Sequence, residues 1–128
     1  MHTTLRRTAC LLLIVTSGCR DGFGGACDAS IQPGIIVVIR DSATGTPLAA
    51  GASGYAIDGA LNDPLHPYGF DGSEMVSRAG ADERPGTYTV LVTHPGYSAW
   101  SRAGIRLTRG ECHVNQVTLT ADLVPAAP

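Results

Sequence analysis

The sequence predicts an all-β protein, an antiparallel β-sandwich of about seven strands preceded by a signal peptide. Gly and Pro are frequent, with 16 and 8 among 128 residues, and this favours short elements joined by tight turns. Several short segments alternate apolar and polar residues with the period of a half-buried strand. No segment shows the apolar stripe of an amphipathic helix. The length fits one domain plus an export segment.

The amino-terminal residues predict export. Two arginines precede an apolar run, residues 9–15, which has the length and flanks of a secretory signal and is shorter than the ~20 residues of a membrane-spanning helix. Small residues then precede Cys19, in a pattern that resembles a lipobox, although Thr16 stands where Leu is more usual. We expect residues 1–18 to be a lipoprotein signal peptide and Cys19 to carry the lipid. An ordinary signal peptide is the alternative.

The cysteine count supports lipidation. Cys10 lies in the segment that would be removed, and lipid on Cys19 leaves Cys27 and Cys112 as one pair. Disulfides persist in the oxidising compartments that exported chains enter. A zinc site is the competing interpretation, but there is no C-x-x-C pair and only His113 lies beside either cysteine. We therefore expect a Cys27–Cys112 disulfide that pins the amino-terminal lead beside the start of the last strand.

The first half of the exported chain contains two clear strand signals. Gly-rich residues 19–33, after the lipid on Cys19, are typical of a flexible tether, and the sandwich is expected over residues 34–124. The β-branched run at residues 35–40 predicts the first strand, and residues 53–57 predict a second.

The middle of the chain is rich in residues that interrupt strands. Gly, Pro, Asn and Asp occur so densely over residues 58–73 that we expect a long loop there. A brief strand over residues 74–78 and a polar turn over residues 79–84 follow.

The second half has the strongest alternation, in residues 86–93. The residues on one face of this strand, expected in the core, are Tyr88, Val90 and Val92. Residues 97–102 and 104–107 predict two short strands, and residues 114–123 predict the last strand, with apolar residues again on one face. Residues 125–128 are expected to be a frayed tail.

Two segments carry a family resemblance. Residues 36–48 run from a β-branched strand into Asp41-Ser42-Ala43-Thr44-Gly45-Thr46-Pro47-Leu48, and this resembles the D-x-x-T-G-x-P-L opening of carboxypeptidase regulatory-like domains. Residues 85–92, followed by Pro95-Gly96-Tyr97, resemble the G-x-Y-x-V-x-V and P-G-Y segments of the same family. The resemblance covers roughly residues 27–124. It implies a transthyretin-like sandwich and a non-catalytic accessory module.

Related folds include enzymes, whose motifs are absent from the sequence. Transthyretin-like hydroxyisourate hydrolases end in Tyr-Arg-Gly-Ser, and this chain does not. Intradiol dioxygenases bind iron with two Tyr and an H-x-H pair, and no H-x-H is present. Ser53 lacks the G-x-S-x-G context of a nucleophile elbow. We therefore expect no catalytic residues, no metal and no cofactor.

Charge excludes further classes of function. From Cys19 onward, seven Arg stand against eleven Asp plus Glu, a net charge of −4. No basic patch is visible, so nucleic acid is not an expected partner. The chain has no Lys, which excludes lysine Schiff-base chemistry and Lys–Asn isopeptide cross-links.

The candidate binding residues lie in the expected loop at 62–73. His66, Tyr68 and Phe70 group an imidazole with two aromatic rings, a combination typical of sugar- or peptide-binding loops. The alternative is that Tyr68 and Phe70 fold back to cover one end of the sandwich. Aspartates around this loop match no EF-hand spacing, and we expect them to form turns.

The sequence thus predicts a non-enzymatic lipoprotein of the bacterial cell envelope, anchored in the membrane by its lipid at the outer membrane or a periplasmic face. Its expected partner is an unknown envelope protein or a polysaccharide. One alternative is a carbohydrate-binding module that uses the 62–73 loop. The other is a small hydrolase or dioxygenase of transthyretin-like fold.

Overall fold

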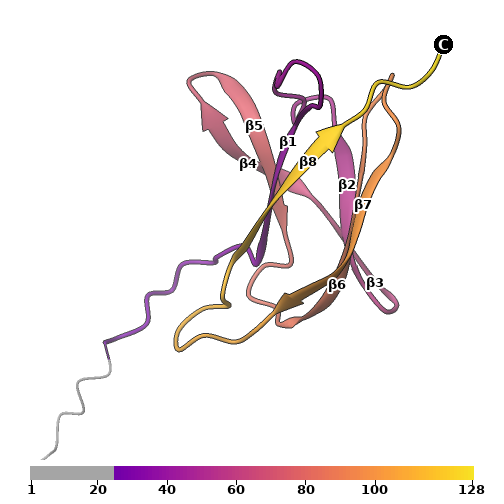
Figure 1. The fold of residues 1–128 in the computed structure, drawn as a ribbon. Helices are drawn as coiled ribbons and strands as arrows, with labels where there is room; N and C mark the ends of the chain where they lie inside the picture. The colour runs from indigo at the N-terminus through magenta and orange to yellow at the C-terminus, as the bar shows by residue number, and fades with distance from the viewer. Residues whose placement is uncertain (1–24) are drawn as a thin grey trace, which may run out of the picture.

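The computed structural model describes residues 25–128, so the expected signal peptide, residues 1–18, and Cys19 lie outside the described residues. The described chain is all β, and its strands are β1 (Ile35–Asp41), β2 (Ser53–Asp58), β3 (Leu61–Pro64), β4 (His66–Asp71), β5 (Glu74–Gly80), β6 (Gly86–Thr93), β7 (Trp100–Leu107) and β8 (Val117–Leu123). Two four-stranded sheets, β4-β5-β1-β8 and β3-β2-β6-β7, pack together (Figure 1). The predicted β-sandwich is therefore confirmed. Over residues 25–128 there is no helix long and apolar enough to cross a membrane.

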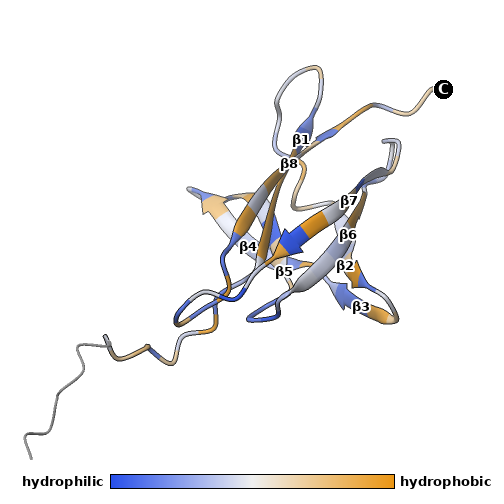
Figure 2. Ribbon diagram, turned by 60° about the horizontal axis from the view of Figure 1, so that its bottom comes forward, coloured by the Kyte–Doolittle hydropathy of each residue, from blue (hydrophilic) through white to orange (hydrophobic). Residues whose placement is uncertain are grey.

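Hydrophobic and hydrophilic residues alternate along the strands (Figure 2), and the buried hydrophobic residues of both sheets form one core. The buried hydrophobic residues of β1, β6 and β8 are Ile35, Val37, Ile39, Tyr88, Val90, Val92, Leu119, Ala121 and Leu123. The inward faces predicted for residues 86–93 and 114–123 are thus confirmed. Each large apolar side chain contributes roughly 1.5–3 kcal/mol when fully buried. The Tyr88 hydroxyl avoids a desolvation penalty because it donates to the Arg84 carbonyl at 3.0 Å.

One strand pair departs from the expected antiparallel arrangement. β1 pairs with β8 in parallel, in continuous register from Ile35 opposite Val117 to Asp41 opposite Leu123. A parallel pair needs a long connection, and here nearly the whole sandwich lies between the two strands in sequence. All other pairs of neighbouring strands are antiparallel.

The long loop expected over residues 58–73 was wrong, because this segment contains β3 and β4. Both strands lie at the edge of a sheet. Proline has no N–H to donate to a neighbouring strand. An edge strand tolerates prolines such as Pro64 and Pro67, because one side of it has no neighbouring strand. Two of the glycines, Gly59 and Gly72, lie in the turns, with φ of 57° and 59°, and Gly69 lies within β4 at its register shifts. Leu65, which is 5 % exposed, passes from one sheet to the other.

The two strands expected over residues 97–102 and 104–107 are one strand, β7. A register shift against β6 interrupts it, and Gly104 has a φ of 72°. Such a bulge interrupts the alternation of apolar and polar residues, so that one strand looks like two in the sequence. The fraying expected over residues 125–128 was wrong for its first two residues. Pro125 bridges Tyr97, and the Ala126 amide donates to the Gly96 carbonyl at 2.9 Å.

Candidate functional site

The predicted binding residues His66, Tyr68 and Phe70 all lie on β4, and we call them the β4 surface. β4 is an edge strand that pairs only with β5. The structure places no buried residue on it. Tyr68 is 42 % exposed and Phe70 is 57 % exposed. Both aromatic rings are therefore accessible to solvent.

The β4 surface offers side chains more readily than backbone. Two register shifts, between Pro67 and Gly69 and between Gly69 and Phe70, disturb the pairing of β4 with β5. Pro67 also lacks an N–H. Irregular pairing and proline are features that prevent an edge strand from adding a further strand. A partner would therefore contact the rings of Tyr68 and Phe70 rather than extend the sheet.

His66 begins β4 and is bonded to its neighbours. Its Nε2 lies 3.2 Å from both carboxylate oxygens of Asp82, and its Nδ1 lies 3.2 Å from the Pro67 carbonyl. Burial lowers the pKa of His66, but the hydrogen bonds to Pro67 and Asp82 outweigh it, so the pKa lies above its ordinary value. His66 is thus an ion-pair partner of Asp82 in this arrangement.

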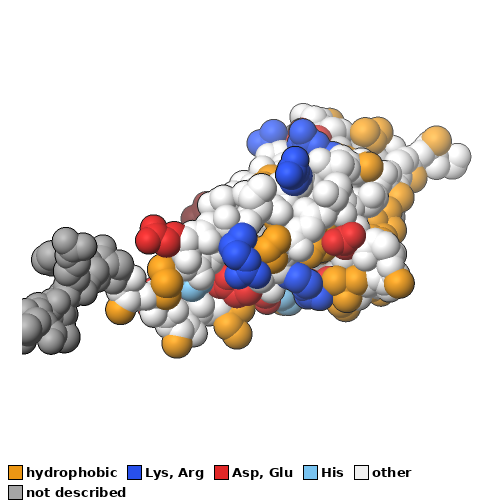
Figure 3. Space-filling model, turned by 90° about the horizontal axis from the view of Figure 1, so that it is seen from below, with side chains coloured by type: hydrophobic (Ala, Val, Ile, Leu, Met, Phe, Trp, Pro, Cys, Tyr) orange, Lys and Arg blue, Asp and Glu red, His pale blue; other side chains and the backbone are white. Residues whose placement is uncertain are grey.

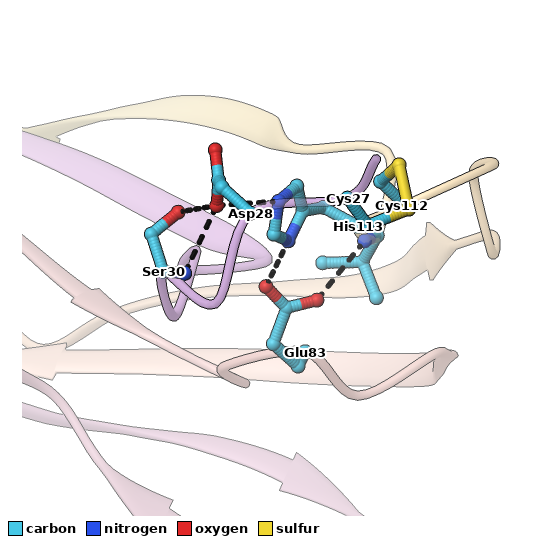
Figure 4. The surroundings of a disulfide bond; sticks show 7 residues. Cys27, Asp28, Ser30, Glu83, Cys112 and His113 are labelled. Atoms are coloured by element: carbon cyan, nitrogen blue, oxygen red, sulfur yellow. Dashed lines mark hydrogen bonds and ion pairs between the residues drawn. A yellow bond between two sulfur atoms is a disulfide. The ribbon is translucent and has the colours of Figure 1, made fainter. Parts of the chain in front are cut away.

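A second cluster surrounds the disulfide. Cys27 and Cys112 are joined with a Cα–Cα distance of 5.2 Å, as predicted. The bond ties the amino-terminal lead (residues 25–33) to the connection between β7 and β8 (Figure 4). Both cysteines are exposed. Figure 3 shows this end of the molecule, where acidic, basic and histidine side chains are intermixed.

Beside the disulfide, His113 lies between two carboxylates; Asp28, Glu83 and His113 form what we call the His113 cluster. The Nδ1 of His113 lies 2.5 Å from Glu83 Oε1, and the Nε2 of His113 lies 3.3 Å from Asp28 Oδ1. Glu83 also accepts from the Gln32 amide at 2.8 Å and from the Val114 amide at 3.4 Å. Glu83 therefore joins the lead, its own turn and the β7–β8 connection.

The electrostatics of the His113 cluster favour its charged form. The hydrogen bond to Glu83 and the charges of Glu83 and Asp28 raise the pKa of His113. The backbone hydrogen bond from Gln32 and then the contact with His113 lower the pKa of Glu83. Hydrogen bonds from Ser30, followed by His113, lower the pKa of Asp28. An imidazole that donates from both nitrogens has no lone pair left to act as a base.

The two segments that carry the family resemblance meet in space. The Tyr97 hydroxyl donates to Asp41 Oδ2 at 2.7 Å. Asp41 Oδ1 accepts from the amides of Ala43 and Thr44 at 2.7 and 2.9 Å. The bond from Tyr97 is the largest cause that lowers the pKa of Asp41. Asp41 thereby fixes the loop after β1 and joins it to the Pro95–Tyr97 turn.

Two further charged side chains near β4, Asp63 and Arg78, have structural partners. Asp63 accepts from the Ala81 amide at 2.6 Å and pairs with Arg84 at 3.3 Å. Arg78 donates to the carbonyls of Ala49 and Leu65. Residues 25–128 contain no group of three or more His, Cys, Asp or Glu side chains placed to hold a metal ion. No pocket is found in the same range.

The sequence analysis missed three of these partners. Asp82 for His66, Glu83 for His113 and Tyr97 for Asp41 lie 16, 30 and 56 residues away in sequence. The only available signal was for the third pair, because both residues belong to the segments that resemble one family. A comparison with family models gave no match, and a comparison with curated proteins gave none either.

Proposed function

We propose that this chain is an exported, lipid-anchored accessory protein of the bacterial cell envelope. In this proposal the β-sandwich is not an enzyme but an interaction module, and it contacts another envelope protein through the β4 surface. The proposal includes the transthyretin-like, carboxypeptidase regulatory-like assignment, which the two-sheet sandwich and the Asp41–Tyr97 bond between the two family segments support.

The exposed rings of β4 are the observation that carries this proposal. Large aromatic side chains contribute strongly to protein contacts because they bury much area at little entropic cost. Tyr68 and Phe70 lie on a strand whose outer edge has no neighbouring strand in its sheet. Neither ring is needed to cover the core, which lies on the other elements.

The environments of the histidines support a non-enzymatic role. His66 and His113 have both ring nitrogens in contact with acceptors, and His94 Nδ1 lies 2.8 Å from the Pro95 carbonyl. A general base needs a free nitrogen within reach of a substrate proton. These side chains are positioned to hold turns and the lead.

The disulfide supports the export part of the proposal. Cys27–Cys112 is exposed to solvent, and such bonds form and persist in oxidising compartments. With Cys27 and Cys112 bonded to each other, Cys19 is the cysteine left to take the lipid in the exported chain. An outer-membrane or periplasmic location follows from this assignment.

A photo-crosslinking experiment tests the contact surface. A photoreactive phenylalanine analogue replaces Phe70 in one variant and Thr120 in the other. Thr120 is also exposed on an edge strand, β8, and serves as the matched control. We expect a discrete protein adduct in whole cells from position 70 alone. Identical adduct patterns at the two positions would contradict a contact through β4.

The intact mass of protein extracted from membranes tests the anchor. We expect a chain that begins at Cys19, carries three acyl groups and lacks two hydrogens because of the disulfide. A Cys19→Ala variant serves as the control and should lose both the acyl mass and membrane fractionation. An unacylated wild-type chain would overturn the anchor.

Carbohydrate binding is a second candidate, favoured by the same exposed rings, since aromatic faces also stack on sugars. Cosedimentation with insoluble peptidoglycan, chitin and cellulose separates the two. If sugar is the ligand, Tyr68→Ala/Phe70→Ala releases the protein into the supernatant, whereas Tyr55→Ala, which removes an exposed ring of β2, does not. Equal sedimentation of all three proteins would remove this candidate.

A further inference from the structure

The amino-terminal lead is attached to the sandwich in an unusual way. Residues 25–31 are all exposed, and Ile31, the largest apolar side chain among them, is 73 % exposed. Apolar burial is the main force that attaches segments to a domain. Here that force is nearly absent, so other bonds must hold the lead.

Three kinds of bond replace it. The first is the disulfide at Cys27. The second is the contact of Asp28 with His113 at 3.3 Å. The third is a reciprocal pair between Gln32 and Glu83, in which the Gln32 amide donates to the Glu83 side chain at 2.8 Å and the Glu83 amide donates to the Gln32 carbonyl at 3.0 Å. After residue 32, Pro33 and Gly34 are bonded to Gln116 and Val117.

We propose that the lead is a releasable strap with two locks: the exposed disulfide, which a dithiol can open, and the His113 cluster, which keeps the reduced lead in place while His113 is protonated. The inference does not depend on what the β4 surface binds. It identifies Cys27–Cys112 as a target for thiol–disulfide exchange and His113 as the group that makes release depend on pH.

The redox lock opens by ordinary exchange. A thiolate of the dithiol attacks one sulfur of Cys27–Cys112, forms a mixed disulfide and expels the other sulfur as a thiolate. The second thiol of the dithiol then attacks the mixed disulfide. The dithiol is oxidised to one disulfide, Cys27 and Cys112 are reduced to two thiols, and two protons pass from the dithiol to the cysteines.

The ionic lock depends on the proton of His113. The charged groups that face it are Asp28 from the lead and Glu83 from the turn between β5 and β6. The protonated ring donates to both carboxylates. The neutral ring donates to only one, and its lone pair then faces the other carboxylate. Loss of the proton therefore removes one hydrogen bond and leaves two negative charges uncompensated.

Residue-resolved hydrogen exchange, expressed as protection relative to the intrinsic rate at each pH, tests both locks. The Gln32 amide reports on the lead, and the Val90 and Val92 amides of β6 report on the core. The proteins are the wild type, Cys27→Ser/Cys112→Ser and His113→Asn, with His94→Asn as the control for a half-buried histidine at the other end. The wild type is also measured with dithiothreitol.

We expect Gln32 in Cys27→Ser/Cys112→Ser and in the reduced wild type to keep its protection below the pKa of His113 and to lose it above. The loss is about tenfold for each pH unit by which closing the lead raises that pKa. The core amides stay protected throughout. In oxidised His113→Asn, Gln32 protection is lower than in the wild type and independent of pH, whereas His94→Asn matches the wild type.

Two results would overturn the proposal. One is a loss of core protection together with Gln32 on reduction, because the disulfide would then hold the whole sandwich and not a strap. The other is Gln32 protection in His113→Asn that equals the wild type at every pH. Since His113→Asn retains the disulfide, this second arm decides the ionic lock even if the cysteine-free variant fails to fold.

Under the proposed lipid anchor, release would lengthen the connection to the membrane. Opening the lead frees the chain from Cys27 to Gln32, which adds up to about 20 Å of reach at full extension. A failed anchor would remove this consequence, but it would leave the exchange result unchanged.

Discussion

The two ends of the sandwich are held together by different means. At the lead end, the lead, the β5–β6 turn and the β7–β8 connection are joined by a disulfide and by the His113 cluster. At the motif end, the loop after β1, the Pro95–Tyr97 turn and the chain after β8 are joined by the bond of Tyr97 to Asp41 and by backbone hydrogen bonds. Figure 1 shows these ends at opposite sides of the molecule.

The two ends differ in how their bonds depend on redox conditions and pH. Bonds at the lead end change with redox conditions and with pH near neutrality, because they use cysteines and a histidine. Bonds at the motif end are backbone hydrogen bonds, the Tyr97–Asp41 bond and the contact of His94 Nδ1 with the Pro95 carbonyl at 2.8 Å. The two ends therefore differ first in redox dependence, because the disulfide lies at the lead end.

Removing the disulfide should have the largest effect on stability. Cys27→Ser/Cys112→Ser frees a loop with a sequence separation of 85 residues, and we expect a loss of about 4 kcal/mol in the free energy of unfolding, chiefly from the entropy of the unfolded chain. Urea unfolding followed by circular dichroism measures it. Ala26→Ser, an exposed neighbour, is the control, and a double-serine variant no less stable than that control would contradict the expectation.

Tyr97→Phe tests the motif end. It removes only the hydroxyl that donates to Asp41, so the pKa of Asp41 should rise toward its ordinary value. A carboxylate whose pKa is lowered by folding stabilises the folded state at pH values above its unfolded pKa. This stabilisation is lost as the pH falls through the lowered, folded-state pKa. The deficit of Tyr97→Phe should thus be full at neutral pH, shrink in acid and stay below that of the double-serine variant.

Carboxyl NMR titration and urea unfolding at several pH values measure these effects. Tyr68→Phe is the matched control, since the Tyr68 side chain is exposed and lies away from this junction. If Tyr97→Phe left the titration of Asp41 unchanged, the bond would not organise the motif end.

His113→Asn tests the contrast between the ends through pH. Folding raises the pKa of His113, first through the hydrogen bond to Glu83. Its stabilisation is therefore complete below the unfolded value, about 6.5, and is lost as the pH rises through the raised value. The stability gap between wild type and His113→Asn should close across that interval. A stability gap between wild type and His113→Asn that stays constant with pH would refute the ionic role of His113.

Some of this architecture was predictable because its cause is local. Tyr88, Val90 and Val92 alternate with polar residues since only one face of β6 is buried, and alternation is visible in sequence. The Cys27–Cys112 pair followed from counting. β3 and β4 escaped prediction because residues of both faces are exposed, which leaves no alternation. The tolerance for Pro64 and Pro67 depends on an edge position that only the assembled sheets define.

The His113 cluster could not be predicted for a different reason. Glu83 receives bonds from Gln32, Val114 and His113, each 30 residues or more away in sequence. Its backbone has a φ of 51°, which a residue with a side chain rarely adopts. Nothing in the local pattern around residue 83 indicates either property, since both arise where three turns converge.

The smallest effect on stability should come from the β4 surface, and this is what would mark it as functional. Tyr68→Ala and Phe70→Ala remove exposed rings, so each should change the free energy of unfolding by no more than about 0.5 kcal/mol. Tyr88→Ala, which removes a buried ring, should cost about 3–5 kcal/mol. Urea unfolding compares them. A cost at Phe70 approaching that at Tyr88 would make the ring a structural element. The crosslink from a photoreactive analogue at position 70 can also be measured in a protein that carries Tyr68→Ala. Loss of that crosslink, together with a negligible change in the free energy of unfolding, would show that these rings contact a partner.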